Sequence, residues 1–152
     1  MTIQIRLLES HETVPMDLLL LADPDESIVR SYIHRGQTWV LESEGTVVGV
    51  YVLLPTRPKT AELVNVAVAE PMQGRGFGQK LVLHAIATAK EQGYGTIEIG
   101  TGNSGVAQLY LYQKCGFRIV GVDLDFFTRH YEEPIYENGI WCRDMIRMQL
   151  DL

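Results

Sequence analysis

The stretch "EPMQGRGFGQKLV", Glu70 to Val82, decides how this chain folds. Three glycines, Gly74, Gly76 and Gly78, alternate with other residues between an apolar run and a long helical pattern. Glycine loses more backbone freedom on folding than any other residue, so a third glycine in one turn needs a reason. A strand, a glycine turn and a helix direct unpaired N–H groups and the positive end of the helix dipole at an anion. The stretch therefore predicts an anion site, or else a turn whose glycines only allow close packing of helix and strand.

The nature of the anion is narrowed by the residues around the glycines. Arg75, inside the turn, either adds a cation to the site or faces solvent. A P-loop requires Gly-Lys-Ser/Thr, whereas Gly78 precedes Gln79, which argues against a nucleoside triphosphatase. The dinucleotide fingerprint is Gly-x-Gly-x-x-Gly with an acid about 20 residues on. Here the spacing is Gly-x-Gly-x-Gly and Glu98 stands near that distance, so a dinucleotide site is the weaker alternative.

Size and charge indicate an ordinary globular enzyme. The 152 residues suit one domain, 1–152, without a linker or repeat, and 46% of them are hydrophobic and 21% charged. The net charge of -6, from 13 Lys and Arg against 19 Asp and Glu, argues against a nucleic-acid partner and suits a cationic substrate.

Targeting, membrane and metal signals are not apparent in the sequence. The start, "MTIQIRLLESHE", lacks the basic and apolar regions of a signal peptide, and "MDLLLLA" and "VVGVYVLLP" fall short of the roughly 18 residues of a membrane span. Cys115 and Cys142 are expected to be reduced thiols, and the four histidines show no metal-ligand spacing. We expect a cytoplasmic protein that uses no metal and binds no membrane.

Hydrophobic periodicity predicts a mixed α/β fold. The segment "SEG" predicts a hairpin turn, "PTRPKT" a loop, and "DPDES" a helix start capped by Asp23. A helix between the strands Glu62–Val68 and Thr96–Thr101 implies that these two are parallel. The other expected strands are Ile3–Leu7, Thr38–Glu42, Thr46–Leu54, one beginning in Gly116–Phe126, and Ile140–Leu150. The expected helices are Val14–Leu21, Asp25–Arg35, one from the glycines to Gln92, and Val106–Cys115.

Two motifs carry a resemblance to a known family. The segment "NVAVAEPMQGRGFGQKLV" resembles the acetyl-coenzyme A signature of the GNAT acyltransferase superfamily, an apolar strand and short loop before Gln/Arg-x-x-Gly-x-Gly/Ala. The later block "NSGVAQLYLYQKCGF" resembles the family's Asn before a helix that ends in Leu-Tyr-x-x-x-Gly-Phe, and "RDMIRMQL" is similar to its closing strand. The resemblance covers about Ile3 to Leu150 and implies a splayed mixed sheet of about seven strands flanked by about four helices.

The resemblance also implies a donor site for acetyl-coenzyme A. In this family the pantetheine arm lies in the splay like an added strand, which here implies pairing with the backbone of Val66, Ala67 and Val68. The N–H of Val68 would hold the thioester oxygen as it gains negative charge. The pyrophosphate would rest on the N–H groups of Gln73, Gly74, Arg75, Gly76, Phe77 and Gly78. Asn103 is the last cofactor residue that the resemblance implies. The family's spacing from this Asn to the Tyr selects Tyr110, whereas the spacing from the Tyr to Gly-Phe selects Tyr112. The mismatch indicates an altered loop at Asn103.

Acyl transfer to an amine requires two proton movements. An alkylamine with a pKa of about 10 is mostly protonated at neutral pH, so a base must accept its proton directly or through water. Glu62, at the start of the strand before the turn, is the candidate base, or else a solvated charge at a strand edge. Asn65 could position a water or the substrate, or be a satisfied polar residue of the strand. The resemblance makes Tyr112 the acid for the departing thiolate, the alternative being packing, as expected for Tyr110.

The acceptor is an amine whose identity the sequence leaves open. The segment Asp123–Gly139 carries five acids and several aromatic residues, which suit a cationic amine through ion pairs and cation–π contacts. The alternatives are a solvated acidic loop or a partner surface, and its Phe–Phe pair could bury itself in a homodimer. "NVAV" hints at a peptide amine. The sequence thus predicts an acetyl-coenzyme A-dependent N-acetyltransferase, the alternative being a non-catalytic module that binds coenzyme A as a sensor or docking signal.

Overall fold

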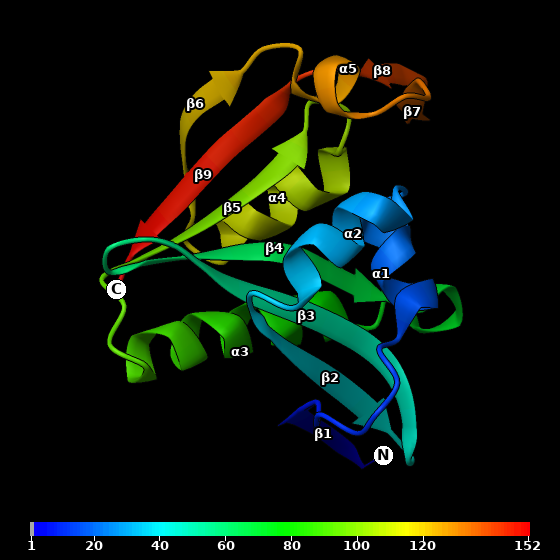
Figure 1. Cartoon of the computed structure of the whole chain (residues 1–152), viewed down its shortest axis with the longest axis vertical. Coiled ribbons are helices and arrows are strands. Elements are labelled where there is room, and N and C mark those ends of the chain that lie inside the picture. Colours follow the sequence, from blue (N-terminus) through cyan, green and yellow to red (C-terminus); the bar gives the residue numbers. More distant parts are fainter. Residues whose placement is uncertain (1) are drawn as a thin grey trace.

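The computed structural model describes residues 2–152, which form helices on both faces of a central sheet (Figure 1). The strands are β1 (Ile3–Leu7), β2 (Gln37–Ser43), β3 (Thr46–Arg57), β4 (Thr60–Val68), β5 (Thr96–Gly102), β6 (Arg118–Asp123), β7 (Ile135–Glu137), β8 (Ile140–Cys142) and β9 (Met145–Asp151). The helices are α1 (Met16–Ala22), α2 (Glu26–Ile33), the short 3-10 helix η1 (Glu70–Met72), α3 (Phe77–Glu91), α4 (Val106–Lys114) and α5 (Phe126–His130).

Seven strands form one sheet in the order β1-β2-β3-β4-β5-β9-β6, and β7 pairs with β8 in a separate hairpin. Within the large sheet β4 and β5 are parallel, as the sequence predicted, and the other neighbours are antiparallel. The predicted mixed α/β fold with a sheet of seven strands is therefore confirmed. The described residues contain five α-helices, one more than expected, because the short helix α5 follows β6.

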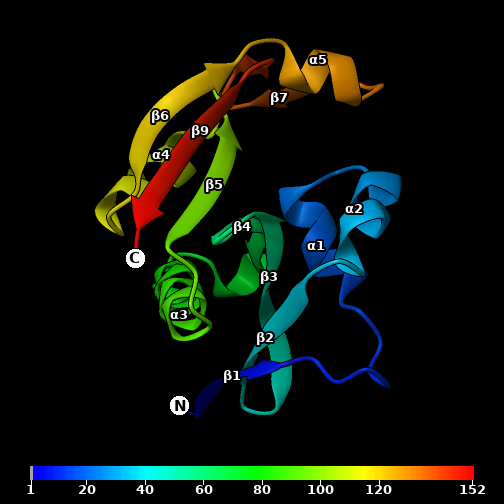
Figure 2. The ribbon, with the colours of Figure 1, turned by 60° about the vertical axis from the view of Figure 1, so that its left-hand side comes forward.

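The sheet splays between β4 and β5. Their pairing runs from Thr60 opposite Thr96 to Leu63 opposite Ile99 and ends there. Beyond that point β4 stays paired with β3 as far as Val68, whereas β5 continues on β9 as far as Gly102. Figure 2 shows the two strands diverging, with β5, β9 and β6 on one side of the gap and β1 to β4 on the other. The gap leaves one edge of β4 without a partner strand.

Two hydrophobic clusters cover opposite faces of the sheet. On one face, α1 and α2 bury Leu19 and Val29 against β2, β3 and β4. On the other face, α3 buries Leu81 and Ala85 against the same strands and β5, and Phe117, just after α4, joins this cluster. Because each face has its own core, both halves of the splayed sheet are held by packing although β4 and β5 separate.

The prediction of a loop for "PTRPKT" was wrong except at Pro58 and Lys59, which form the turn between β3 and β4. Strand β3 extends to Arg57, β4 begins at Thr60, and Pro55 lies opposite Ala61. Pairing with β2 ends at Leu53. Pro55 therefore lies on an edge, where its missing N–H costs no ladder hydrogen bond, which is where a strand tolerates proline.

Two further local expectations need correction. The expected last strand Ile140–Leu150 is divided into β8, which pairs with β7, and β9, which pairs with β5 and β6. The cap of α2 is Asp25 and not Asp23, because the Asp25 side chain accepts the N–H groups of Ser27 and Ile28. Asp23 is thereby left for other contacts.

Candidate functional site

The glycine turn has two kinds of glycine. Gly74 and Gly76 have φ angles of +78° and +83°, a left-handed backbone that residues with a Cβ rarely adopt, and a Cβ at either would meet nothing within 4 Å. Gly78 lies inside α3, where a Cβ would lie 3.5 Å from the Leu111 side chain of α4. Gly74 and Gly76 therefore shape the turn, whereas a Cβ at Gly78 would make only an ordinary van der Waals contact with α4.

The turn leaves the start of α3 open to an anion. Gly76 occupies the cap position, no side chain caps the helix, and its first turn contains no acid. The first N–H groups of a helix have no partner within it, and they carry the positive end of the dipole. Phe77 is buried by its ring in the core, so its contribution to this end is its backbone. The geometry of Gln73 to Gly78 is thus that of an anion cradle.

The unpaired edge of β4 offers backbone groups to the same region. The N–H of Ala69 donates to the carbonyl of Val48 at 2.8 Å, on the β3 side. Because backbone groups alternate along a strand, the N–H groups of Val68 and Val66 point to the opposite, splayed side. Gln73 confirms this direction, since its Nε2 donates to the carbonyl of Val68 at 2.9 Å. An extended ligand can therefore pair with this edge as an additional strand.

One cavity of about 920 Å³ joins the glycine turn to the far end of the splay. Val66, Ala67 and Val68 line it, as do Gln73, Gly74, Gly76, Phe77 and Gly78 from the turn and helix start. Arg75, which is exposed, does not line it. The cavity continues past Glu62, Asn65 and Tyr112 to residues of α2, α5 and β7. The structure thus brings nearly all the predicted site residues to one continuous space.

Asn103 is, with Arg75, a predicted cofactor residue that does not line the cavity. Its Oδ1 accepts the N–H groups of Arg143 and Asp144 at 2.8 and 2.9 Å, and its Nδ2 donates to the carbonyl of Trp141 at 3.1 Å. Asn103 does not line the cavity. Its side chain fixes the connection between β8 and β9, which fits the altered loop that the motif spacing indicated.

Glu62 lies on β4 just before the splay, with its side chain on the cavity. Burial raises the pKa of this carboxyl and Glu98, opposite it on β5, raises it further, while Arg147, Arg35 and Arg57 lower it. A carboxylate with a raised pKa is a stronger proton acceptor than an exposed one, because a neutral form is favoured.

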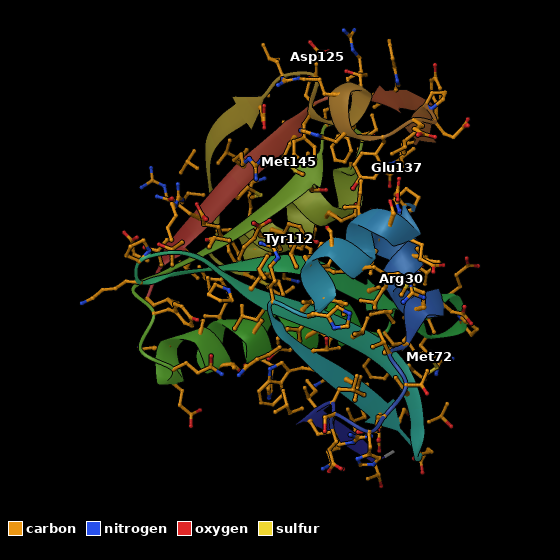
Figure 3. All side chains as sticks on the ribbon, viewed as in Figure 1. Arg30, Met72, Tyr112, Asp125, Glu137 and Met145 are labelled. Atoms are coloured by element: carbon orange, nitrogen blue, oxygen red, sulfur yellow. The ribbon has the colours of Figure 1, made fainter. Side chains whose placement is uncertain are left out.

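Tyr112 and Tyr110 lie on the same helix, α4, but Tyr112 is buried and Tyr110 is exposed. Tyr112 is 5% exposed, lines the cavity and contacts Phe117 edge-on at 6.4 Å between ring centres. Tyr110 is 69% exposed and lies under Lys114. Figure 3 shows Tyr112 near the middle of the view, close to where β4 and β5 diverge. Burial raises the pKa of Tyr112, so its hydroxyl keeps a proton that it can donate.

The acidic and aromatic segment Asp123–Gly139 reaches the cavity only in part. Phe126, Phe127, Tyr131 and Glu137 line it. The other acids face away, since Asp123 pairs with Arg147 and Arg129, Asp125 pairs with Arg143, and Glu132 and Glu133 line a smaller outer pocket. In Figure 3 Asp125 lies at the outer end of the molecule, beside α5.

A polar network on the cavity wall, formed by Asp23, Tyr32, Asn65 and Tyr131, was not predicted. Tyr131 and Tyr32 both donate to the carboxylate of Asp23, and Tyr32 accepts from Asn65. The only local signal was the acid Asp23 before α2, which looked like a helix cap. The links to Tyr131 and Asn65 span 108 and 33 residues between the bonded pairs, so no motif spacing could reveal them.

In the residues that the structure describes, no helix is long and apolar enough to cross a membrane. The same residues include no group of three or more His, Cys, Asp or Glu side chains placed to hold a metal ion.

Comparisons with known proteins agree with this geometry. The model of the acetyltransferase (GNAT) family matches residues 6–117. An uncharacterized N-acetyltransferase, YvbK, of Bacillus subtilis (strain 168) is 57% identical over 150 residues, 99% of this chain and 97% of that protein. A Bacillus subtilis acetyltransferase solved with CoA has a TM-score of 0.94 at 56% identity, with 99% of each chain covered. A GNAT acetyltransferase from Elizabethkingia anophelis with acetyl-CoA bound has a TM-score of 0.97 at 43% identity, covering 99% of this chain and 98% of the other.

Proposed function

The chain belongs to the GNAT family of acetyl-coenzyme A-dependent acetyltransferases, and we propose that it acetylates a primary amine by direct attack in a ternary complex. The observation that carries this proposal is the single cavity of about 920 Å³. It joins the anion cradle, the open edge of β4 and the side chains of Glu62 and Tyr112. Donor and acceptor can therefore meet in one space without a covalent enzyme intermediate.

The donor is held by backbone groups. The N–H groups from Gly74 to Gly78 bind the pyrophosphate at the left-handed turn and the uncapped helix start, whereas the N–H of Gln73 already donates to the carbonyl of Glu70. The edge of β4 pairs with the pantetheine arm through Val66 and Val68. The N–H of Val68 donates to the thioester oxygen and stabilises the negative charge that develops there. Acetyl-coenzyme A supplies the activated acyl group and a thiolate leaving group.

Two side chains move protons. Glu62 accepts the proton of the attacking amine, directly or through a water, and its raised pKa suits this role. Tyr112, which lines the same cavity, donates a proton to the departing thiolate. The amine nitrogen forms the new C–N bond as the C–S bond breaks. An ammonium group loses two protons in all, one before attack and one as the amide forms; the sulfur gains one proton, and the other leaves to solvent through Glu62.

Calorimetry with acetyl-coenzyme A, followed by thiol release over a panel of primary amines, tests the proposal. We expect binding and amine-dependent thiol release, with one molecule of acetylated amine formed per thiol. Binding without release on any amine would instead support the non-catalytic module that senses coenzyme A. Absence of binding would contradict both functions.

A further inference from the structure

Asp23 is a buried carboxylate without a cationic partner in the part of the chain that the structure describes. It is 8% exposed and lies between α1 and α2 on the wall of the large cavity. The hydroxyl of Tyr131 donates to its Oδ1 at 2.9 Å and the hydroxyl of Tyr32 to its Oδ2 at 3.2 Å. The backbone N–H of Asp25 also donates to Oδ1, at 3.3 Å.

Asn65 adds an unfilled acceptor to the same wall. Its Nδ2 donates to the carbonyl of Leu19 and to the hydroxyl oxygen of Tyr32, both at 3.0 Å. A carbonyl can only accept, so the contact with Leu19 fixes which end of the amide is nitrogen. The Oδ1 atom of Asn65 is then buried with no donor within residues 2–152, although a buried polar atom usually has a partner.

The acceptor positions that Asp23 and Asn65 leave unfilled suit a cation. An ionised carboxylate offers about four acceptor positions, and three donors occupy those of Asp23, which leaves one on Oδ2. Asn65 Oδ1, which is buried, is an acceptor without a donor in the same network, and the hydroxyl of Tyr32 joins the two residues. An ammonium group has three N–H donors and a positive charge, and the rings of Tyr32 and Tyr131 beside Asp23 suit a cation.

This cation differs from the amine that reacts. The reacting amine must lose its proton near Glu62, and a second ionised carboxylate beside it would hold that proton in place. The hydroxyl of Tyr32 donates to Asp23, and Tyr32, Asp23 and Glu62 all line the cavity. Burial raises the pKa of Tyr32, and the charges of Asp23 and Glu62 both raise it further. Asp23 and Glu62 both line the cavity, so a single acceptor would place its reacting amine at Glu62 and a second ammonium group at Asp23.

We propose that Asp23, with Asn65 and Tyr32, forms a subsite for a second, non-reacting ammonium group, so that the acceptor is a dibasic amine. The proposal rests on the proposed acetyl transfer and specifies its substrate class. Burial raises the pKa of Asp23, whereas the hydrogen bonds from Tyr131 and Asp25 lower it. A bound ammonium group would also favour the ionised form of the carboxyl.

Binding to the unmodified protein tests the subsite without turnover. Calorimetry on protein saturated with coenzyme A would compare the binding of cadaverine with that of two ligands of the same length. In hexylamine a methyl group replaces the second ammonium group, and in the ω-amino acid a carboxylate replaces it. We expect cadaverine to bind at least tenfold more tightly than either. Equal affinities, or tighter binding of the amino acid through the cavity residue Arg35, would overturn the proposal. This result is independent of transfer, so loss of the proposed function would appear separately as binding without thiol release.

The variant Asp23→Asn then tests whether Asp23 causes the preference for cadaverine over hexylamine. The matched control is Asp17→Asn, which changes an exposed acid of α1 that does not line the cavity. We expect the ratio of kcat/KM for cadaverine to that for hexylamine to fall at least tenfold in Asp23→Asn and to stay at the parent value in the control. Acetyl-coenzyme A affinity reports whether each variant is folded. A folded Asp23→Asn that keeps the parent ratio would contradict the assignment, and if it does not fold, the binding order in the parent decides.

Discussion

Gly76→Ala should separate the cost of backbone strain from the loss of the anion cradle. At φ +83° an added Cβ meets nothing within 4 Å, so no atom of the protein needs to move. The cost to folding is that of a left-handed alanine, about 1–2 kcal/mol. For a chain of this size that corresponds to a fall in Tm of roughly 2–8 °C. The same methyl group lies on the cavity wall, where phosphate oxygens must reach the N–H groups of α3.

Gly45→Ala is the matched control. Gly45 lies in the hairpin turn between β2 and β3 at φ +81°, and a Cβ there also meets nothing within 4 Å. We expect both variants to show the same fall in Tm by calorimetric scanning. Only Gly76→Ala should weaken acetyl-coenzyme A binding, by at least tenfold in titration calorimetry. Equal affinities in the two variants would refute the cradle, because strain alone would then account for every effect at Gly76.

Three further predictions concern single side chains. Tyr112→Phe should lower kcat by about a hundredfold while acetyl-coenzyme A affinity is kept, and Tyr110→Phe, on the exposed face of α4, should change neither. Because Glu62 must be ionised to accept a proton, kcat/KM should fall as pH drops through its raised pKa, above the usual value of about 4.3; a pH profile of Glu62→Gln should lack this limb. Glu12 accepts hydrogen bonds from Arg6, which lower its pKa to about 2. Its stabilisation is therefore present above the unfolded pKa of about 4.3 and is lost as pH falls through about 2, so Glu12→Gln should lower Tm at pH 7 and leave it unchanged at pH 2.

The donor side of the site could be predicted because it is local. Val66, Val68 and the three glycines fall within one strand, one turn and the start of one helix, so sequence order fixes their order in space. The choice of Tyr112 over Tyr110 also depended on a short-range rule, the spacing to Gly-Phe at the end of the same helix. The structure places Tyr112 on the cavity and Tyr110 outside, as that spacing indicated.

Elements that depend on tertiary partners were the ones missed. Pro55 reads as a strand breaker unless the reader knows that β2 has already ended beside it. The segment 140–150 reads as one strand because its two apolar runs are nearly continuous, yet the first run pairs with β7 and the second with β5 and β6. The helix α5 has only five residues and depends on its surroundings more than on intrinsic propensity.

The two ends of the cavity are therefore specified in different ways, and this difference bears on how specificity can change. The donor end that we propose consists mainly of backbone groups in one continuous stretch of the chain. The acceptor end is closed by a hydrogen bond from Tyr131 to Asp23, residues 108 apart, and by side chains of α2, α5 and β7. Figure 2 shows α2 on one side of the splay and α5 and β7 on the other. We expect a chain with this fold to be able to keep acetyl-coenzyme A as its donor while its acceptor substrate changes. Position 23 is where we first expect a substitution to accompany such a change.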